Sequence, residues 1–324
     1  MTQAIRIHQY GGPEVLNLET VEAGEPGEGQ VRLRHSAIGV NFIDVYMRTG
    51  LYPLSGFPQT LGMEAAGVVE AVGPGVAGLE VGNRVAYAMV LGAYAEQRLV
   101  DAEKLVRLPD AIEERTAAAM MLRGMTARYL LKSSYPVQAG DTILVMAAAG
   151  GVGLLLCQWA RHLGATVIGC VGSAEKAQLA RDNGCHHTIL YKEEDVAARV
   201  LDITAGQGVA VSYDSVGQAT LMPSLDSLRP TGTLVSYGNA SGPITDFSPG
   251  ILAQKGSLYI QRPTLATYIR NRELLEACAG DLFEVVASGA VKVTVGQEFA
   301  LSDAAKAHQA LEARQTTGST ILLP

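Results

Sequence analysis

The fold of this chain is decided by the stretch Gly140-Asp-Thr-Ile-Leu-Val-Met-Ala-Ala-Ala-Gly-Gly-Val-Gly153. An apolar run of strand length, 142–147, is followed by small residues and then by a helix-like segment, 152–163. Backbone can approach a pyrophosphate where side chains are absent, and a helix N-terminus offers free N–H groups to it. The spacing Ala148-x-Gly150-x-x-Gly153 matches the dinucleotide fingerprint, with alanine in the first glycine position. The stretch therefore predicts the phosphate-binding turn of a dinucleotide fold.

The second strand of this domain, 165–171, indicates which dinucleotide is bound. A cofactor with a free ribose 2′-hydroxyl usually meets an Asp or Glu roughly 20 residues past the first glycine. The end of this strand carries no carboxylate, and Ser173 and Lys176 follow it, a hydroxyl and a cation that suit a 2′-phosphate. Glu175 argues the other way, since it could turn toward the ribose. We predict NADPH; the alternative is that Ser173 caps the next helix and Lys176 is a solvated surface lysine.

Bulk composition is that of a soluble enzyme. The 324 residues suffice for about two domains, and 48% hydrophobic residues with 36 glycines fit compact, turn-rich folds. A net charge of −7 disfavours nucleic acid or an anionic membrane as the main partner. No apolar run approaches the ~20 residues that span a bilayer, and the polar start Met1-Thr-Gln lacks a secretory pattern. We therefore expect a cytoplasmic protein.

Cysteines and histidines predict no metal site. The four cysteines, Cys157, Cys170, Cys185 and Cys278, are scattered without a CxxC pair, so neither disulfides nor a zinc site of the usual spacing are expected. Cys157 and Cys170 fall in a predicted helix and a predicted buried strand, where we expect them to be small core residues. The adjacent His186 and His187 would point to opposite faces of a strand. A surface or capping role, and no catalytic one, is expected for the isolated histidines His8, His35, His162 and His308.

The pattern along the chain changes twice. The N-terminal third has short alternating runs between Gly/Pro turns, which predicts a β-rich barrel or sandwich: 4–8, 31–37 and 67–72. A helix is predicted from about 113 to 132. Strands are then predicted at 142–147, 165–171, 187–191, 208–214, 232–237 and 257–261, with helices near 152–163, 174–183, 193–204 and 218–228. Six such strands with right-handed crossovers make a doubly wound parallel sheet.

After Pro263 the character becomes mixed again. A helix is predicted near 270–288, a short strand near Lys292, a helix around 302–312 and a last strand at 319–323. We expect this tail to pack back onto the N-terminal domain, with a cleft between the two lobes.

These residues resemble the medium-chain dehydrogenase/reductase superfamily, and within it the zinc-free quinone oxidoreductases of the zeta-crystallin type. The resemblance covers essentially the whole chain and rests on ordered motifs: Asn41-Phe-Ile-Asp-Val-Tyr-Met-Arg-Thr-Gly-Leu-Tyr52, Leu61-Gly-Met-Glu-Ala-Ala-Gly-Val-Val-Glu-Ala-Val-Gly73, Val81-Gly-Asn-Arg-Val85, the Gly140–Gly153 stretch, Tyr213-Asp-Ser-Val-Gly217 and Tyr237-Gly-Asn239. It implies an α/β protein in which a Rossmann NADPH-binding domain, 123–262, interrupts a GroES-like β-rich catalytic domain made of 1–122 and 263–324. It also implies a homodimer joined through the nucleotide-domain sheets.

Departures from the zinc-dependent relatives exclude one chemistry. Those enzymes place a metal-binding cysteine where this chain has Asn41, a histidine where it has Met63, and often a four-cysteine lobe where it reads Tyr87-Ala-Met-Val-Leu-Gly-Ala93. Glu64 remains, but a single carboxylate is not a zinc site. Alcohol oxidation in the superfamily uses the metal to stabilise an alkoxide, so it is not expected here.

The resemblance predicts an NADPH:quinone oxidoreductase that reduces a small quinone without a metal. One alternative is a reductase of enone or 2-alkenal double bonds. Another is a protein whose nucleotide pocket serves binding or structure, as in crystallin-like or RNA-binding relatives; the intact glycine turn and acidic balance count against it.

Site residues are carried over from the matching motifs. Asn41 and Tyr46 are implied to lie beside the nicotinamide and Tyr52 to border the quinone pocket. Asn41 could hold the carboxamide or orient the acceptor, and the two tyrosines could donate a hydrogen bond or stack on a planar ring. The alternative makes both tyrosines partly exposed packing residues. Asp44 is expected to fix the loop by bonding backbone N–H groups rather than to act as a base. The remaining predicted cofactor contacts are Thr126 at the nicotinamide end, Gly150, Gly151, Val152 and Gly153 around the pyrophosphate, Gly172, Ser173, Lys176 and Tyr191 around the adenosine phosphate, Ser215, Tyr237, Gly238 and Asn239 at the sheet edge, and Arg314, which could instead be a solvated helix-end arginine.

Overall fold

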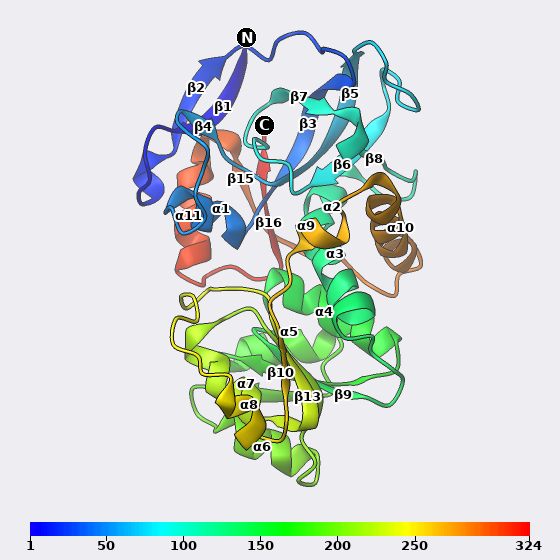
Figure 1. Ribbon diagram of the computed structural model, residues 1–324. Helices are drawn as coiled ribbons and strands as arrows, with labels where there is room; N and C mark the ends of the chain where they lie inside the picture. Colours follow the sequence, from blue (N-terminus) through cyan, green and yellow to red (C-terminus); the bar gives the residue numbers. More distant parts are fainter. The chain divides into compact units, whose positions relative to one another are not determined.

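The computed structural model describes residues 1–324 and divides into two compact units (Figure 1). The first unit comprises 1–125, 269–287 and 293–324, and the second comprises 126–268 and 288–292. None of the helices combines the length and the apolar character needed to cross a bilayer.

The first unit is built on two β-sheets. The larger sheet has the strand order β15 (Val295–Ala300), β16 (Ser319–Leu323), β3 (Gln30–Val40), β5 (Glu64–Val72), β6 (Arg84–Ala88) and β8 (Val106–Arg107), with β7 (Gln97–Asp101) also paired to β3. The smaller sheet has the order β2 (Asn17–Val21), β1 (Thr2–Ile7) and β4 (Gln59–Thr60). The last strand of the chain, β16, runs antiparallel to β3, so the C-terminus completes a sheet begun near the N-terminus (Figure 1).

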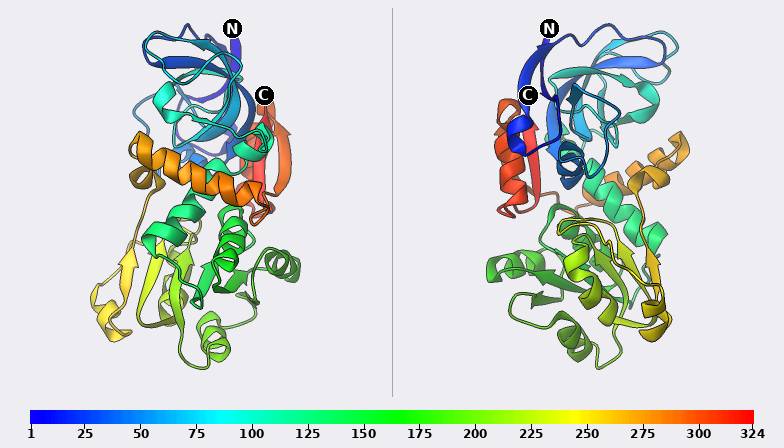
Figure 2. Two further views of the ribbon diagram at one scale, coloured as in Figure 1. Left: turned by 90° about the vertical axis from the view of Figure 1, so that its right-hand side faces the viewer. Right: turned by 60° about the vertical axis from the view of Figure 1, so that its left-hand side comes forward.

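Seven helices and helical turns complete this unit. They are η1 (Pro13–Val15), α1 (Phe42–Arg48), η2 (Ala102–Lys104), α2 (Glu114–Ala118), α10 (Arg272–Ala287), η5 (Leu301–Asp303) and α11 (Ala304–Glu312). Figure 2 shows α11 (red-orange) beside the N-terminal turn η1 (blue). Aliphatic residues that alternate along β1 and β3 pack in one core with Leu322 of β16 and with α11. This agrees with the β-rich domain predicted from the alternating runs of the N-terminal third.

The single helix predicted over 113–132 is wrong in one respect, because the segment is broken. It consists of α2, then α3 (Met121–Tyr129), then a π-helical turn (Leu130–Ser134). The break follows from side chains that bind the carbonyl at the end of α2: Ser319 Oγ donates to Ala119 O at 2.7 Å and Arg123 Nη1 donates to it at 3.3 Å. Side-chain donors thus replace the helix's own N–H groups at this point.

The second unit contains one six-stranded parallel sheet, which confirms the predicted doubly wound fold. Its order is β11 (His187–Leu190), β10 (Thr166–Val171), β9 (Thr142–Met146), β12 (Val209–Asp214), β13 (Leu228–Ser236) and β14 (Tyr259–Gln261). The connecting helices are α4 (Gly151–His162), α5 (Ala174–Asp182), α6 (Val196–Ile203), η4 (Gln218–Thr220), α7 (Leu221–Asp226) and α8 (Gly250–Gln254), and α9 (Leu265–Tyr268) follows the last strand.

Strand β9 lies at the centre of this sheet and is buried on both faces. Leu144 and Met146 belong to a core formed with α6 and α7, whereas the alternate residues Ile143 and Val145 are equally inaccessible on the other side. The strand order reverses here, since β10 lies on one side of β9 and β12 on the other. Ligands of doubly wound sheets bind beyond the carboxyl ends of the strands at such a switch point.

Candidate active site

The glycine turn lies at the switch point of the second unit's sheet. Gly150 is the N-cap of α4, and a short link, 147–150, joins β9 to this helix. A Cβ on Gly153 would collide with the carbonyl oxygen of Ala147 and would lie 2.7 Å from that of Ala148. Both neighbours are backbone atoms that cannot turn away. The turn can therefore form only with glycine at this place, and the first turn of α4 keeps its N–H groups open to an anion.

A second group of predicted cofactor residues gathers after β10. Ser173 is the N-cap of α5, and its hydroxyl accepts a hydrogen bond from the backbone N–H of Lys176 at 3.3 Å. The same hydroxyl hydrogen-bonds the exposed Glu175 and lowers the pKa of that carboxyl. The hydroxyl of Tyr191 would lie 2.8 Å from a Cβ on Gly172, so its ring lies against this backbone. The structure thus brings these four predicted residues together, and it also shows the capping role of Ser173.

The loops after β12 and β13 meet at the same edge of the sheet. A Cβ on Gly238 would collide with the carbonyl oxygen of Ser215, and Tyr237 N donates to Asp214 O at 2.8 Å. The Asp214 carboxylate organises this edge by accepting four hydrogen bonds, from Val216 N, Gly217 N, Thr220 Oγ1 and Ser224 Oγ at 2.6–3.0 Å. In the sequence Asp214 stood out only as part of a motif; an acid followed within ten residues by Gly, Thr and Ser was the available signal.

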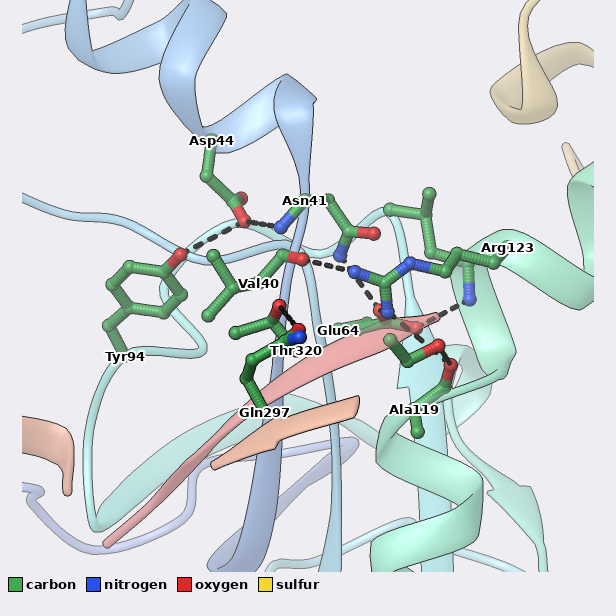
Figure 3. A network of polar contacts seen from close by, with 11 residues as sticks. Val40, Asn41, Asp44, Glu64, Tyr94, Ala119, Arg123, Gln297 and Thr320 are labelled. Carbon is green, nitrogen blue, oxygen red and sulfur yellow. Dashed lines mark hydrogen bonds and ion pairs between the residues drawn. The ribbon is translucent and has the colours of Figure 1, made fainter. Parts of the chain in front are cut away.

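A buried polar cluster surrounds Asn41 in the first unit (Figure 3). Asn41 follows β3 directly and is the N-cap of α1. Its side-chain Nδ2 donates to Glu64 Oε1 at 2.7 Å. Glu64 Oε2 accepts from Leu122 N at 2.6 Å, and Arg123 Nη1 lies 3.4 Å from Oε1. Burial raises the pKa of Glu64, but every neighbour is a donor, which requires the ionised, acceptor-only form.

Asp44, one turn into α1, is the second buried carboxylate of this cluster. Its Oδ2 accepts from Asn41 N at 2.7 Å, which confirms that Asp44 fixes the loop through a backbone N–H group. Tyr94 Oη donates to the same oxygen at 3.0 Å, whereas Oδ1 is buried without a hydrogen-bond partner. Burial is the main cause that raises the pKa of Asp44 to about 7, against the lowering effect of these two hydrogen bonds.

Two histidines expected at the surface are buried, so that expectation is wrong. His308 Nε2 lies 2.9 Å from Tyr94 Oη and its Nδ1 lies 3.1 Å from Arg48 Nη1. Arg48 in turn forms a bidentate pair with Glu312 at 2.8 and 2.9 Å. His35 bonds Ala95 O and the hydroxyl of Tyr87. Each histidine is enclosed because partners remote in sequence satisfy both ring nitrogens.

The predicted tyrosines lie together, with Tyr46 on α1 and Tyr52 in the loop that follows it. The rings of Tyr46 and Tyr52 meet edge to face, with their centroids 5.2 Å apart, and the ring centroid of Phe42 lies 6.1 Å from that of Tyr46. Both tyrosines are half-buried, as either interpretation required. Arg314 follows α11 in the first unit, where it is exposed and has a left-handed backbone with φ of 57°. Thr126 is buried in α3, at the start of the second unit.

The side chains available to a metal are dispersed. Nowhere in the chain do three or more His, Cys, Asp or Glu side chains gather in a way that could hold a metal ion. All four cysteines are buried and free, and Cys157 Sγ lies 3.5 Å from Cys185 Sγ. Met63 is buried in the loop before β5.

Comparison with known proteins agrees with this architecture. Residues 27–110 match the family model described as an alcohol dehydrogenase GroES-like domain, and residues 151–279 match that of a zinc-binding dehydrogenase. The chain is 54% identical to the quinone oxidoreductase of Pseudomonas aeruginosa over the full length of both proteins. It is 48% identical to a 2-haloacrylate reductase of a Burkholderia species, covering 100% of this chain and 99% of that protein.

A solved structure extends the likeness to three dimensions. The crystal structure of the Escherichia coli quinone oxidoreductase complexed with NADPH superimposes with a TM-score of 0.98 at 47% identity, covering 99% of this chain and 100% of that one. Identity of this extent confirms the resemblance inferred from the motifs. The chain therefore belongs to the quinone oxidoreductase family of the medium-chain dehydrogenase/reductase superfamily.

Proposed function

We propose that this chain is an NADPH-dependent quinone oxidoreductase that works without a bound metal. The observation that carries the proposal is the glycine turn at the switch point of the sheet, beside β10, whose last residues carry no carboxylate and which is followed by Ser173 and Lys176. The same activity is supported by identities of 54% and 47%, over the full length, with the quinone oxidoreductases of Pseudomonas aeruginosa and Escherichia coli. NADPH, when bound, supplies the hydride.

The second unit offers fitting places for the pyrophosphate and for the adenosine end of this cofactor. The space that a Cβ on Gly153 would fill and the free N–H groups of α4 suit the pyrophosphate, which Gly150, Gly151 and Val152 would also border. Lys176 and Ser173 would bind the 2′-phosphate, for which Glu175 must release the serine hydroxyl. Tyr191, 40% exposed and set against Gly172, would stack on the adenine. Contacts toward the nicotinamide end are assigned to Asn41, Thr126, Ser215, Tyr237, Gly238 and Asn239, and Arg314 is assigned to the 2′-phosphate.

The acceptor chemistry makes modest demands on the protein. A quinone is electron-poor, and its reduced oxygen is a phenolate-like anion that one hydrogen bond or a water can stabilise. We assign this role to the hydroxyl groups of Tyr46 and Tyr52, whose rings pack edge to face. The main contribution of the remaining residues is to hold the acceptor in line for transfer.

Replacing Lys176 with alanine tests the cofactor assignment. Loss of a charge-assisted hydrogen bond should weaken NADPH binding by about 1–2 kcal/mol and spare NADH. Lys255, which pairs with Asp226 at the surface of the same unit, provides the control: Lys255→Ala should change neither affinity. Titration of both cofactors by fluorescence measures the effect. Equal losses for NADPH and NADH would contradict the assignment.

The Burkholderia relative favours one second candidate, reduction of an activated carbon–carbon double bond. A turnover comparison of 1,4-benzoquinone and an enone, with NADPH and a chelator present, separates the two. Faster enone turnover would reverse their order, and loss of activity with the chelator would contradict the metal-free proposal. Tight NADPH binding without oxidation by any acceptor would favour a structural or nucleic-acid-binding role.

We also propose a homodimer joined through the second unit. The edge strand β14 is open on one side, and Tyr259 on it is 63% exposed. A second copy of this edge would cover both, since an unpaired strand is a template for another. Light scattering during gel filtration should give twice the chain mass; a monomer for the wild type would contradict the proposal, and Tyr259→Lys should yield that monomer.

A further inference from the structure

We propose that Glu64 is a positioning residue that sets the direction of the Asn41 amide, so that Asn41 offers its oxygen to the carboxamide NH2 group of the nicotinamide. The inference rests on the proposed function insofar as NADPH is the ligand. It adds a specific polarity to Asn41, which by resemblance could equally hold the carboxamide or orient the acceptor.

Glu64 can act only as an acceptor in its present surroundings. Asn41 Nδ2, Arg123 Nη1 and Leu122 N all direct N–H groups at its two oxygens, at 2.7, 3.4 and 2.6 Å. The carboxylate is 0% exposed. It lies beneath β3, where a Cβ on Gly39 would collide with it. A protonated Glu64 would carry an O–H group facing one of these donors, so the ionised form is the one that fits.

The direction of the Asn41 amide follows from this. An amide has an oxygen on one side and an NH2 group on the other, and Glu64 can bind only the NH2 group. The oxygen of Asn41 consequently points away from Glu64, as Figure 3 shows. The backbone of Asn41 is held separately by Asp44, at 2.7 Å, so the residue cannot rotate as a whole. Asn41 therefore presents an acceptor.

An acceptor discriminates between the two candidate ligands. A quinone carries carbonyl oxygens, which are themselves acceptors and are repelled by the oxygen of Asn41. The carboxamide of nicotinamide carries an NH2 group, which is the complementary donor. The structure thus assigns Asn41 to the cofactor, and donors for the quinone must come from elsewhere, such as Tyr46 or Tyr52.

Replacing Glu64 with glutamine should reverse this polarity with little change of shape. The oxygen of the introduced glutamine must face Leu122 N, because that backbone N–H group cannot turn. The NH2 group of the same side chain then replaces Oε1, so that Arg123 loses this acceptor and Asn41 faces a donor, which its amide must flip to meet. Asn41 would present its NH2 group, and the contact with the carboxamide would be lost.

A second substitution should restore the original polarity. In the double variant Asn41→Asp with Glu64→Gln, the acid and the amide have exchanged places. The introduced glutamine then donates to the introduced aspartate, which presents an oxygen as Asn41 did. The net charge of the chain stays at −7, and the cluster still contains two carboxylates, now at positions 41 and 44. Asn41→Asp alone sets two carboxylates against each other and should be impaired.

Cofactor affinity, measured without any quinone, gives the readout. Fluorescence titration compares NADPH with its reduced 3-acetylpyridine analogue, in which a methyl ketone, an acceptor only, replaces the carboxamide. Wild type should prefer NADPH by about three- to tenfold, the range of one neutral hydrogen bond. Glu64→Gln should abolish or invert this preference, and the double variant should restore it. Because no acceptor is present, the result is independent of whether quinones are reduced.

Controls separate this effect from simple damage. Glu114→Gln breaks another Glu–Arg pair of the same unit, with Arg84, and should leave the preference unchanged. If Glu64→Gln does not fold, Asn41→Asp and the double variant decide: better binding and a restored preference in the double variant support the proposal. A wild type without preference for NADPH, an unchanged preference in Glu64→Gln, or additive losses in the double variant would each overturn it.

Discussion

Replacing His308 with glutamine should remove part of the acid sensitivity of the first unit. Arg48 has only donors, so the Nδ1 atom of His308, 3.1 Å from it, must accept. The proton of the neutral ring then lies on Nε2 and is donated to Tyr94, whose hydroxyl donates to Asp44. Burial, reinforced by Arg48, lowers the pKa of His308 to about 3. Glutamine can make the same two contacts, since its oxygen can accept from Arg48 and its NH2 group can donate to Tyr94.

The size of the effect follows from linkage. In the unfolded chain a histidine has a pKa of about 6.5, so between pH 6.5 and 3 the unfolded state binds a proton that the folded state does not. Stability from neutral His308 is thus present above pH 6.5 and is lost as the pH falls. At pH 5.0 the pH lies about 1.5 units below the pKa of the unfolded histidine, which corresponds to a loss of about 2 kcal/mol in the free energy of unfolding. Between pH 7.5 and 5.0 the free energy of unfolding of His308→Gln should therefore fall by about 2 kcal/mol less than that of the wild type.

Hydrogen exchange of peptides that cover α11 and α1, at both pH values, measures opening of the first unit. The only tryptophan, Trp159, lies in the second unit and serves as an internal reference. The unfolding midpoint measured by its fluorescence should be the same in His308→Gln as in the wild type. His8→Gln is the matched control, because His8 is exposed in the same unit and should keep the wild-type loss. The same loss in His308→Gln as in wild type would refute the reasoning, and would mean that His308 is not held neutral by its enclosure.

Two further substitutions, Gly153→Val and Asp214→Asn, test the second unit, each with a control variant. Gly153→Val should abolish NADPH binding or folding, because the new side chain would collide with backbone atoms; cofactor titration and calorimetry test this. Gly280→Ala is the control, since a Cβ at this glycine of α10 meets nothing within 4 Å and should raise the free energy of unfolding by up to about 1 kcal/mol, as measured by calorimetry. Asp214→Asn should cost about 1–3 kcal/mol, since an NH2 group would replace the oxygen to which the hydroxyl groups of Thr220 and Ser224 now donate, and both hydroxyl groups would lose their acceptor. Urea unfolding followed by Trp159 fluorescence gives this value, and a loss no larger than that of the surface variant Asp226→Asn would count against it.

The second unit was predictable from sequence because its signals are local. The six strands of its sheet each fall within the predicted ranges or within four residues of them, since apolar runs, glycine turns and helix caps act over a few residues. The glycine turn is the clearest case: the collision expected at Gly153 involves residues only five and six positions earlier. The strand expected near Lys292 was less well placed, because β15 begins at Val295.

The polar cluster of the first unit was largely unpredictable because its partners are remote in sequence. Arg48 and His308 are 260 residues apart, and Arg123 and Glu64 are 59 apart. An isolated histidine in sequence is indistinguishable from a surface one until such partners are known. Asp44 was an exception, since its bond to Asn41 N spans three residues and follows the usual pattern of a helix start. Sequence could therefore name Asn41 but could not show what orients it.

The two carboxylates that hold Asn41 differ in how their burial is compensated. Glu64 has a guanidinium beside it, that of Arg123, which also donates to Val40 O. Asp44 has only the neutral donors Tyr94 and Asn41 N on Oδ2, and its pKa consequently rises to about 7. Apolar side chains of similar volume would give a core of equal or greater stability. They could not, however, fix an amide oxygen in one direction, and the fold bears the cost of two buried acids at the residue where we infer that this direction selects the cofactor.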